Sequence, residues 1–282
     1  MQNRLRLGRK GAALTVIAML LAAVVTLAVA CGGSSGSNSS GLSGTISESG
    51  STTVQPLAND LANAFMKENP HVLVIIRGGG SSAGIKDANA GTSDIGASSR
   101  ALTSSDPALI TYLLGYDGIA VITNNGNSVS GLTKQQVAYI FSGNITNWKQ
   151  VGGTDAKIIV VIREEGSGTR SSFEGVVMNG SQITADHIET NSNGIMKTTV
   201  SGAPNSIGYL SLGYLDNTVK TLTFNGVACT EATVKNGTYP ISHPLYFLTK
   251  TQATGTVKAF IDYCTGTAGQ AIVTQDGYVP AQ

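Results

Sequence analysis

The 282-residue chain carries little charge, and that charge is unevenly distributed. It has 18 Lys and Arg and 17 Asp and Glu, and four of the basic residues lie in the first ten positions, which leaves a balance of about −3 for the rest. This balance, with a single Trp, argues against nucleic acid as a partner. A bound anion would have to be held by local geometry.

The first thirty residues predict export from the cytoplasm. A basic head (residues 4–10) precedes an uncharged apolar run (residues 11–30), the pattern of a signal segment. The small residues before Cys31 resemble a lipoprotein signal, which implies lipidation of Cys31 and anchoring at the outer face of the cell membrane. The alternative is an uncleaved membrane anchor, because about 20 apolar residues can span a bilayer. Residues 31–43 are mostly Gly and Ser and predict a flexible tether.

Beyond the tether, strand-like and helix-like runs alternate, which predicts an α/β fold with mostly parallel pairing. A first strand (residues 45–48) leads through Ser and Thr to a helix that starts near Pro56 and ends before Pro70. A second strand (residues 72–76) leads through a Gly and Ser loop to a short helix (residues 85–90). Residues 93–97 predict a buried strand that opens with Asp94.

The middle and end of the chain continue this pattern. Thr133 and Gln136 fit a capping box at a helix start, and we interpret Trp148 as a packing residue. A strand (residues 158–162) precedes Arg163, a Gly and Ser loop and another helix. Ser171 and Glu174 offer an alternative capping box for that helix. Residues 257–264 indicate a further amphipathic helix.

Three of these strand-to-helix junctions contain Gly, Ser and Thr, and one also contains Arg163. The first turn of a helix has unpaired N–H groups and a partial positive charge, so it attracts anions. Arg adds a planar fork that matches two oxygens of a phosphate group. Together the junctions predict an oxyanion site.

Known catalytic and nucleotide motifs do not fit the same loops. Gly79 and Gly84 have P-loop spacing, but Ile85 and Lys86 follow instead of Lys and Ser or Thr. Ser167 does not lie in a GxSxG elbow. The three His residues are scattered at positions 71, 187 and 243 and show no metal-ligand spacing. We therefore expect neither an enzyme nor a cofactor.

Several runs resemble the phosphate-binding protein of the high-affinity phosphate ABC transporter. They are GSTTVQP (50–56), RGGGSSAGIKDANAGTSDIGASSR (77–100), IFSGNITNW (140–148), IREEGSGTR (162–170) and GQAIVTQDGYVP (269–280). The resemblance implies a two-lobed type II periplasmic-binding-protein fold with a ligand cleft between the lobes. It also implies a monomer that delivers inorganic phosphate to permease subunits. We expect lobe one to comprise residues 44–118 and 237–282, and lobe two residues 119–236.

The resemblance also implies a set of phosphate contacts. These are Thr52 and Thr53 in the first loop, Ser81 in the second, Asp94, Arg163, and the helix-start residues Ser167, Gly168 and Thr169. Many relatives carry an apolar or aromatic residue at the position of Thr53, so its backbone N–H is the surer contact. Arg170 either adds charge at the rim of the site or is a solvated residue of the first helical turn.

The resemblance assigns Asp94 the role of accepting a hydrogen bond from the ligand. Phosphate near neutral pH carries a proton and sulfate does not, so a buried carboxylate would favour phosphate. The alternatives are a binder of sulfate, molybdate or tungstate, a secreted phosphatase, and a lipid-anchored sensor or adhesin of the same fold. Cys229 and Cys264 either pair outside the cytoplasm or remain two buried thiols.

Overall fold

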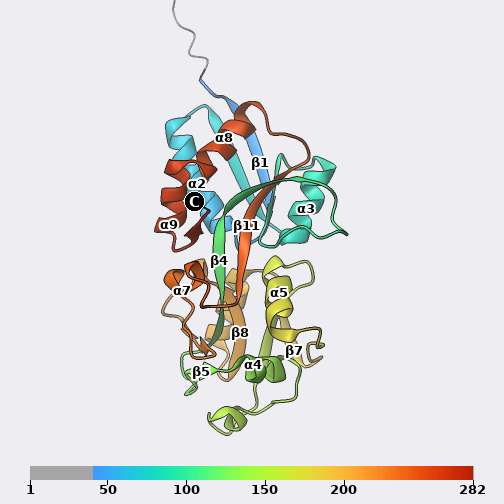
Figure 1. Ribbon diagram of the computed structural model, residues 1–282, viewed down its shortest axis with the longest axis vertical. Helices are drawn as coiled ribbons and strands as arrows, with labels where there is room; N and C mark the ends of the chain where they lie inside the picture. Colours follow the sequence, from blue (N-terminus) through green and yellow to red (C-terminus); the bar gives the residue numbers. More distant parts are fainter. Residues whose placement is uncertain (1–40, 282) are drawn as a thin grey trace, which may run out of the picture. The chain divides into compact units, whose positions relative to one another are not determined.

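The computed structural model describes residues 41–281 (Figure 1). The predicted signal segment and Cys31 lie outside the described residues. No helix within residues 41–281 has the length and apolar character needed to cross a bilayer.

The described chain forms two lobes, each with its own hydrophobic core. The first core draws on residues 46–114 and 245–278. Its elements are β1 (Gly44–Gly50), α2 (Gln55–Glu68), β2 (Val72–Gly78), α3 (Ser81–Ala90), β3 (Ile95–Ser98), α8 (Gly255–Thr265) and α9 (Thr267–Gln275). The apolar face of α2 carries Leu57, Leu61 and Phe65, all buried, and α2 packs with α8 and α9 (Figure 1).

The second core draws on residues 119–241 and on Val279. Its strands are β5 (Gly131–Leu132), β6 (Ile159–Arg163), β7 (His187–Thr190), β8 (Ser206–Ser211), β9 (Val219–Thr221) and β10 (Thr223–Phe224). Its helices are α4 (Lys134–Phe141), η1 (Trp148–Val151), α5 (Gly168–Phe173), η2 (Glu174–Met178), α6 (Asn193–Gly202), η3 (Leu212–Tyr214) and α7 (Glu231–Lys235). The exact lobe boundaries given above stay a prediction.

Two long strands, β4 (Ile110–Asn124) and β11 (Ser242–Thr249), run antiparallel and side by side from one lobe to the other (Figure 1). They are the centre of one sheet with the order β2-β1-β3-β11-β4-β8-β6-β7, and β12 (Val279–Pro280) also pairs with β4. The pairs next to them, β3 with β11 and β4 with β8, are also antiparallel. Farther out the pairs are parallel: β1 with β2 and β3, and β6 with β7 and β8. The expected parallel pairing therefore holds for the outer strands of each lobe, whereas every pair that involves β4 or β11 is antiparallel.

Local signals located several elements correctly. The capping box of Thr133 and Gln136 opens α4, and Trp148 is fully buried with its Nε1 bonded to the Asn205 carbonyl oxygen. The alternative helix start at Ser171 is wrong. Ser167 caps α5 by accepting from the Arg170 N–H, and the Ser171 hydroxyl donates to the Ser167 carbonyl oxygen inside the helix.

The two cysteines of the described chain are free. Cys229 belongs to the core of lobe two, and Cys264 belongs to the core of lobe one. Because each thiol is buried in a different core, a disulfide between them would require both lobes to unfold. The structure contradicts the pairing and supports the reading of two buried thiols.

Candidate functional site

The first half of the candidate site lies at the carboxyl ends of the strands in lobe one. Parallel β1 and β3 end together, at Gly50 and Ser98, so the residues that follow them meet. The hydroxyl of Ser51 donates to Ser99 Oγ at 2.9 Å, and Ser81 Oγ, at the start of α3, accepts from the Ser99 N–H at 3.0 Å. All three serines are buried. They form a hydroxyl cluster that can both donate and accept hydrogen bonds.

The second half of the candidate site follows β6 in lobe two. The strand ends at Arg163, and the loop after it leads into α5 at Gly168. The first N–H groups of that helix, at Gly168 and Thr169, have no acceptor within the helix. Their dipoles add a partial positive charge at this point.

Arg163 is the central charged group, with only 1% of its surface exposed. Its Nε and Nη2 each donate to Glu164 at 2.9 Å, and Nη2 also donates to Thr52 Oγ1 at 3.2 Å. Its Nη1 is buried and has no hydrogen-bond partner within residues 41–281. Leaving such a donor unpaired costs free energy, more for a charged group than for a neutral one. The guanidinium is therefore arranged to receive an acceptor from outside residues 41–281.

The two lobes touch directly around this guanidinium. Thr53 Oγ1 lies 2.7 Å from Thr169 Oγ1, and the Ser82 N–H donates to the Gly166 carbonyl oxygen at 3.0 Å. A Cβ placed on Gly168 would clash with the Ser81 hydroxyl and would lie 2.6 Å from Ser99 Oγ. The structure therefore shows the lobes closed on each other at the site.

Comparisons with known proteins agree with this geometry. The model of the PBP superfamily domain matches residues 35–267. The phosphate-binding protein PstS of Bacillus subtilis (strain 168) is 34% identical, over 94% of this chain and 93% of its own length. This chain belongs to the PstS family of the PBP superfamily.

Two solved structures resemble the chain closely. One is a putative phosphate ABC transporter substrate-binding protein with bound phosphate from Clostridium perfringens, at 39% identity and a TM-score of 0.82, covering 85% of this chain and all of that one. The other is an ABC-type phosphate transport receptor from Vibrio cholerae, at 36% identity and a TM-score of 0.70, covering 84% of this chain and all of that one. The type II periplasmic-binding-protein fold expected from the sequence is confirmed.

The structure brings seven of the eight predicted contacts of this PstS-family chain to the closed region between the lobes. They are Thr52, Thr53, Ser81, Arg163, Ser167, Gly168 and Thr169. The hydroxyl of Ser167 accepts the capping bond from the Arg170 N–H at 3.2 Å and keeps its own proton for donation. Their contact with a ligand stays a prediction.

Asp94 does not join this group, and its predicted position in the cleft is wrong. It is exposed, and its carboxylate accepts bonds from the N–H and the hydroxyl of Ser47 at 2.8 and 2.7 Å. Asp94 precedes β3, whereas the cleft lies beyond the other end of that strand, at Ser99. Ligands bind at the carboxyl ends of parallel strands, a rule that would have favoured Ser99 over Asp94.

The sequence analysis missed two residues of lobe two that form hydrogen bonds with Thr52 and Thr53. Asn193 opens α6 and donates through Nδ2 to Thr53 Oγ1 at 2.9 Å. Tyr214 donates from its hydroxyl to the Thr52 carbonyl oxygen at 2.8 Å. Burial raises the pKa of Tyr214, so the phenol stays protonated and keeps this bond. Ser192 before α6 is a typical N-cap, but nothing local indicates that the helix start faces Thr52.

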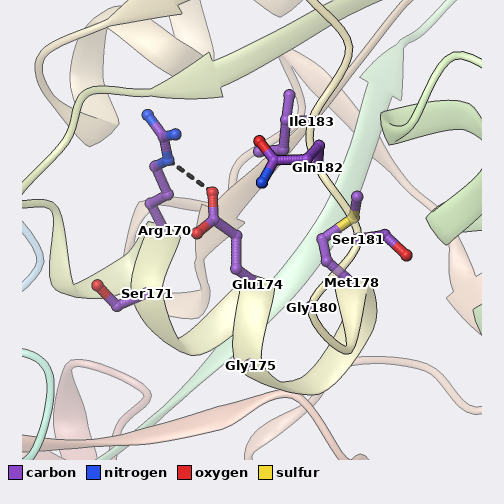
Figure 2. A pocket seen from close by; sticks show the side chains of 9 residues that line it. All are labelled: Arg170, Ser171, Glu174, Gly175, Met178, Gly180, Ser181, Gln182 and Ile183. Atoms are coloured by element: carbon purple, nitrogen blue, oxygen red, sulfur yellow. Dashed lines mark hydrogen bonds and ion pairs between the residues drawn. The ribbon is translucent and has the colours of Figure 1, made fainter.

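Arg170 is neither a rim charge nor a solvated residue. Figure 2 shows it directed at Glu174, with Nε donating to the Glu174 carboxylate at 2.7 Å. Its Nη1 donates to the Arg163 carbonyl oxygen at 3.0 Å. The two side chains line a pocket of about 460 Å³ between α5, η2 and the loop at 180–183. Arg170 therefore stabilises the main chain of Arg163 through a hydrogen bond from outside the closed region.

Proposed function

We propose that this chain captures inorganic phosphate outside the cytoplasm and delivers it to the permease of an ABC uptake transporter, without catalysing a reaction. The observation that carries the proposal is the buried Arg163, whose Nη1 has no acceptor within the described chain. The Clostridium perfringens relative, at 39% identity, has bound phosphate in its structure. The monomeric state expected from the family stays a prediction.

Both lobes would contribute to a ligand held at this position. Arg163 and the first N–H groups of α5 supply charge-assisted donors from lobe two. The hydroxyls of Ser81 and Thr52 supply further hydrogen bonds from lobe one. Because the anion is contacted from both sides, it stabilises the closed form over the open one. A hinge motion along β4 and β11 would then open the site for release.

The choice of phosphate over other oxyanions rests on different groups from those expected. Glu164 brings a carboxylate to the described site, and both its oxygens accept bonds from Arg163. The ligand proton would therefore be accepted by a hydroxyl oxygen, with Ser81 and Ser99 best placed for it. A neutral hydroxyl also tolerates an unprotonated oxyanion, so we expect sulfate to be rejected less steeply than a carboxylate would reject it.

Titration calorimetry on the purified protein with phosphate, arsenate, sulfate, molybdate and tungstate tests this function. We expect phosphate to bind tightest, arsenate to compete with it and sulfate to follow. Tightest binding of sulfate, molybdate or tungstate would favour the rival oxyanion function. Steady release of phosphate from a phosphate ester would instead favour a phosphatase.

Asp94→Asn is expected to leave phosphate affinity within about twofold of the parent, because Asp94 lies at the far end of β3. The change weakens the bonds that Asp94 accepts from Ser47, which should lower the free energy of unfolding by about 1 kcal/mol. Calorimetry and denaturant unfolding measure the two effects. A large loss of phosphate affinity in the folded variant would return Asp94 to the site.

We also propose that Cys31 carries the lipid that holds the protein at the outer face of the membrane. The apolar run and small residues before Cys31 support it. Cys31→Ala should abolish lipid attachment, measured by membrane fractionation and by the mass of the mature N-terminus. An intact N-terminus in the parent protein would favour the uncleaved anchor.

A further inference from the structure

Asn193 is a fully buried amide in lobe two whose orientation is fixed by its neighbours. Its Oδ1 accepts from the Ser211 N–H at 3.4 Å. A backbone N–H can only donate, so the oxygen of the amide must face Ser211. The nitrogen therefore faces lobe one, where Nδ2 donates to Thr53 Oγ1 at 2.9 Å and to Thr52 Oγ1 at 3.3 Å.

These bonds determine what the Thr52 hydroxyl can do. Its oxygen accepts from Arg163 Nη2 at 3.2 Å, from Asn193 Nδ2 at 3.3 Å and from the Asn193 N–H at 3.4 Å. A hydroxyl has two lone pairs and one proton. Three N–H groups point at the two lone pairs of Thr52 Oγ1, so both lone pairs are occupied. The proton of the hydroxyl is therefore left to donate.

The Thr53 hydroxyl is constrained in the same way. It accepts from Asn193 Nδ2 and shares a 2.7 Å hydrogen bond with Thr169 Oγ1. The hydroxyls of Thr53 and Thr169 together carry two protons, and one of these protons lies between the two oxygens. Whichever residue donates that bond, the other proton remains free for an acceptor. Asn193 thus leaves two donors beside the guanidinium of Arg163.

We propose that Asn193 is a positioning residue that sets the hydroxyl of Thr52, and one hydroxyl of the Thr53–Thr169 pair, as donors toward a bound tetrahedral oxyanion. The inference rests on the proposed function. It adds which protonation state the ligand oxygens must have next to these threonines. The threonine hydroxyls beside Arg163 donate protons, and their lone pairs are already occupied. They therefore select ligand oxygens that carry no proton. Any proton on the ligand is directed toward Ser81 and Ser99.

Asn193→Asp tests the proposal, since it keeps the size of the side chain and replaces the donor with an acceptor. The introduced carboxylate would draw the protons of Thr52 and Thr53 to itself and would repel the anion. We expect phosphate affinity to fall about a hundredfold at pH 8. Protonating the introduced carboxyl restores a donor, and burial beside an anion raises its pKa. The ratio of variant to parent Kd should therefore shrink from pH 8 to pH 5.

A residue that only holds the fold together would lower the free energy of unfolding and leave the Kd of the folded protein close to that of the parent at every pH. Asn124→Asp is the matched control. Asn124 is a half-buried asparagine of lobe two that donates through Nδ2 to the Val200 and Ser201 carbonyl oxygens. We expect this control to keep phosphate affinity within about twofold at every pH. A pH-independent ratio for Asn193→Asp would overturn the proposal.

A double-mutant cycle tests the same point if Asn193→Asp does not fold. Asn193→Ala should cost about tenfold in phosphate affinity in the parent. In a protein carrying Thr52→Val and Thr53→Val, the same change should cost less than about threefold, because the hydroxyls it acts through are gone. An equal loss in both backgrounds, or none in the parent, would overturn the role of Asn193. A parent that binds no oxyanion at all would overturn the proposed function itself.

Discussion

Arg163→Ala is expected to weaken phosphate binding by about a hundredfold or more. Removing one partner of a buried charge pair typically costs about 3–5 kcal/mol. Here the change also leaves the Glu164 carboxylate, which now accepts two bonds from Arg163, facing the anion without compensation. Isothermal titration calorimetry on the folded variant measures the loss.

Two further variants make this result specific to the guanidinium. Arg163→Lys keeps the charge but not the planar fork, so we expect its affinity to lie between those of the alanine variant and the parent. Lys149→Ala removes an exposed cation of lobe two that pairs with Asp155, and it should leave affinity unchanged. A folded Arg163→Ala protein that binds phosphate within a few-fold of the parent would remove Arg163 from the site.

Gly168→Ala is expected to weaken phosphate binding by about tenfold to a hundredfold by preventing closure. The added Cβ would clash with the Ser81 hydroxyl and would lie 2.6 Å from Ser99 Oγ and 2.9 Å from the Ser99 carbonyl carbon. Both serines belong to the opposite lobe, so the clash exists only when the lobes are closed. Overpacking of this kind typically costs about 1–3 kcal/mol.

Small-angle scattering with and without phosphate separates this effect from local damage. The parent should contract when phosphate is added, and Gly168→Ala should contract less. Gly175→Ala is the matched control, because a Cβ there meets nothing within 4 Å and the residue lies in the helical segment that continues α5. Unchanged affinity and full contraction in Gly168→Ala would show that the lobes do not close as the structure describes.

The sequence alone predicted the parts of this molecule that depend on neighbours in the chain. The helix of Leu57, Leu61 and Phe65 follows from apolar spacing, and the start of α4 follows from its capping box. The loops after β1, β2 and β6 were located because Gly, Ser and Thr cluster between a strand and a helix. The individual contacts were implied by the family resemblance, and seven of the eight lie in or beside these loops.

The predictions that failed depend on where strands end and on which segments meet in space. Asp94 lies at the start of β3 (Ile95–Ser98), as the sequence indicated, but the cleft lies beyond the other end of that strand, at Ser99. Asn193 lies 140 positions from Thr53, so only the tertiary fold reveals their contact. Whether Cys229 and Cys264 pair was likewise open from the sequence, and their separate cores decide it in favour of two buried thiols.

The position of a bound oxyanion shows whether the ligand lies between the lobes at Arg163. Arsenate has the geometry of phosphate, and a crystal grown with it gives an anomalous signal at the arsenic absorption edge. We expect the strongest peak between the lobes, with arsenate oxygens within about 3 Å of Arg163 Nη1 and of the hydroxyls of Thr52 and Ser81. A strongest peak elsewhere, such as the pocket between Arg170 and Gln182, would contradict it.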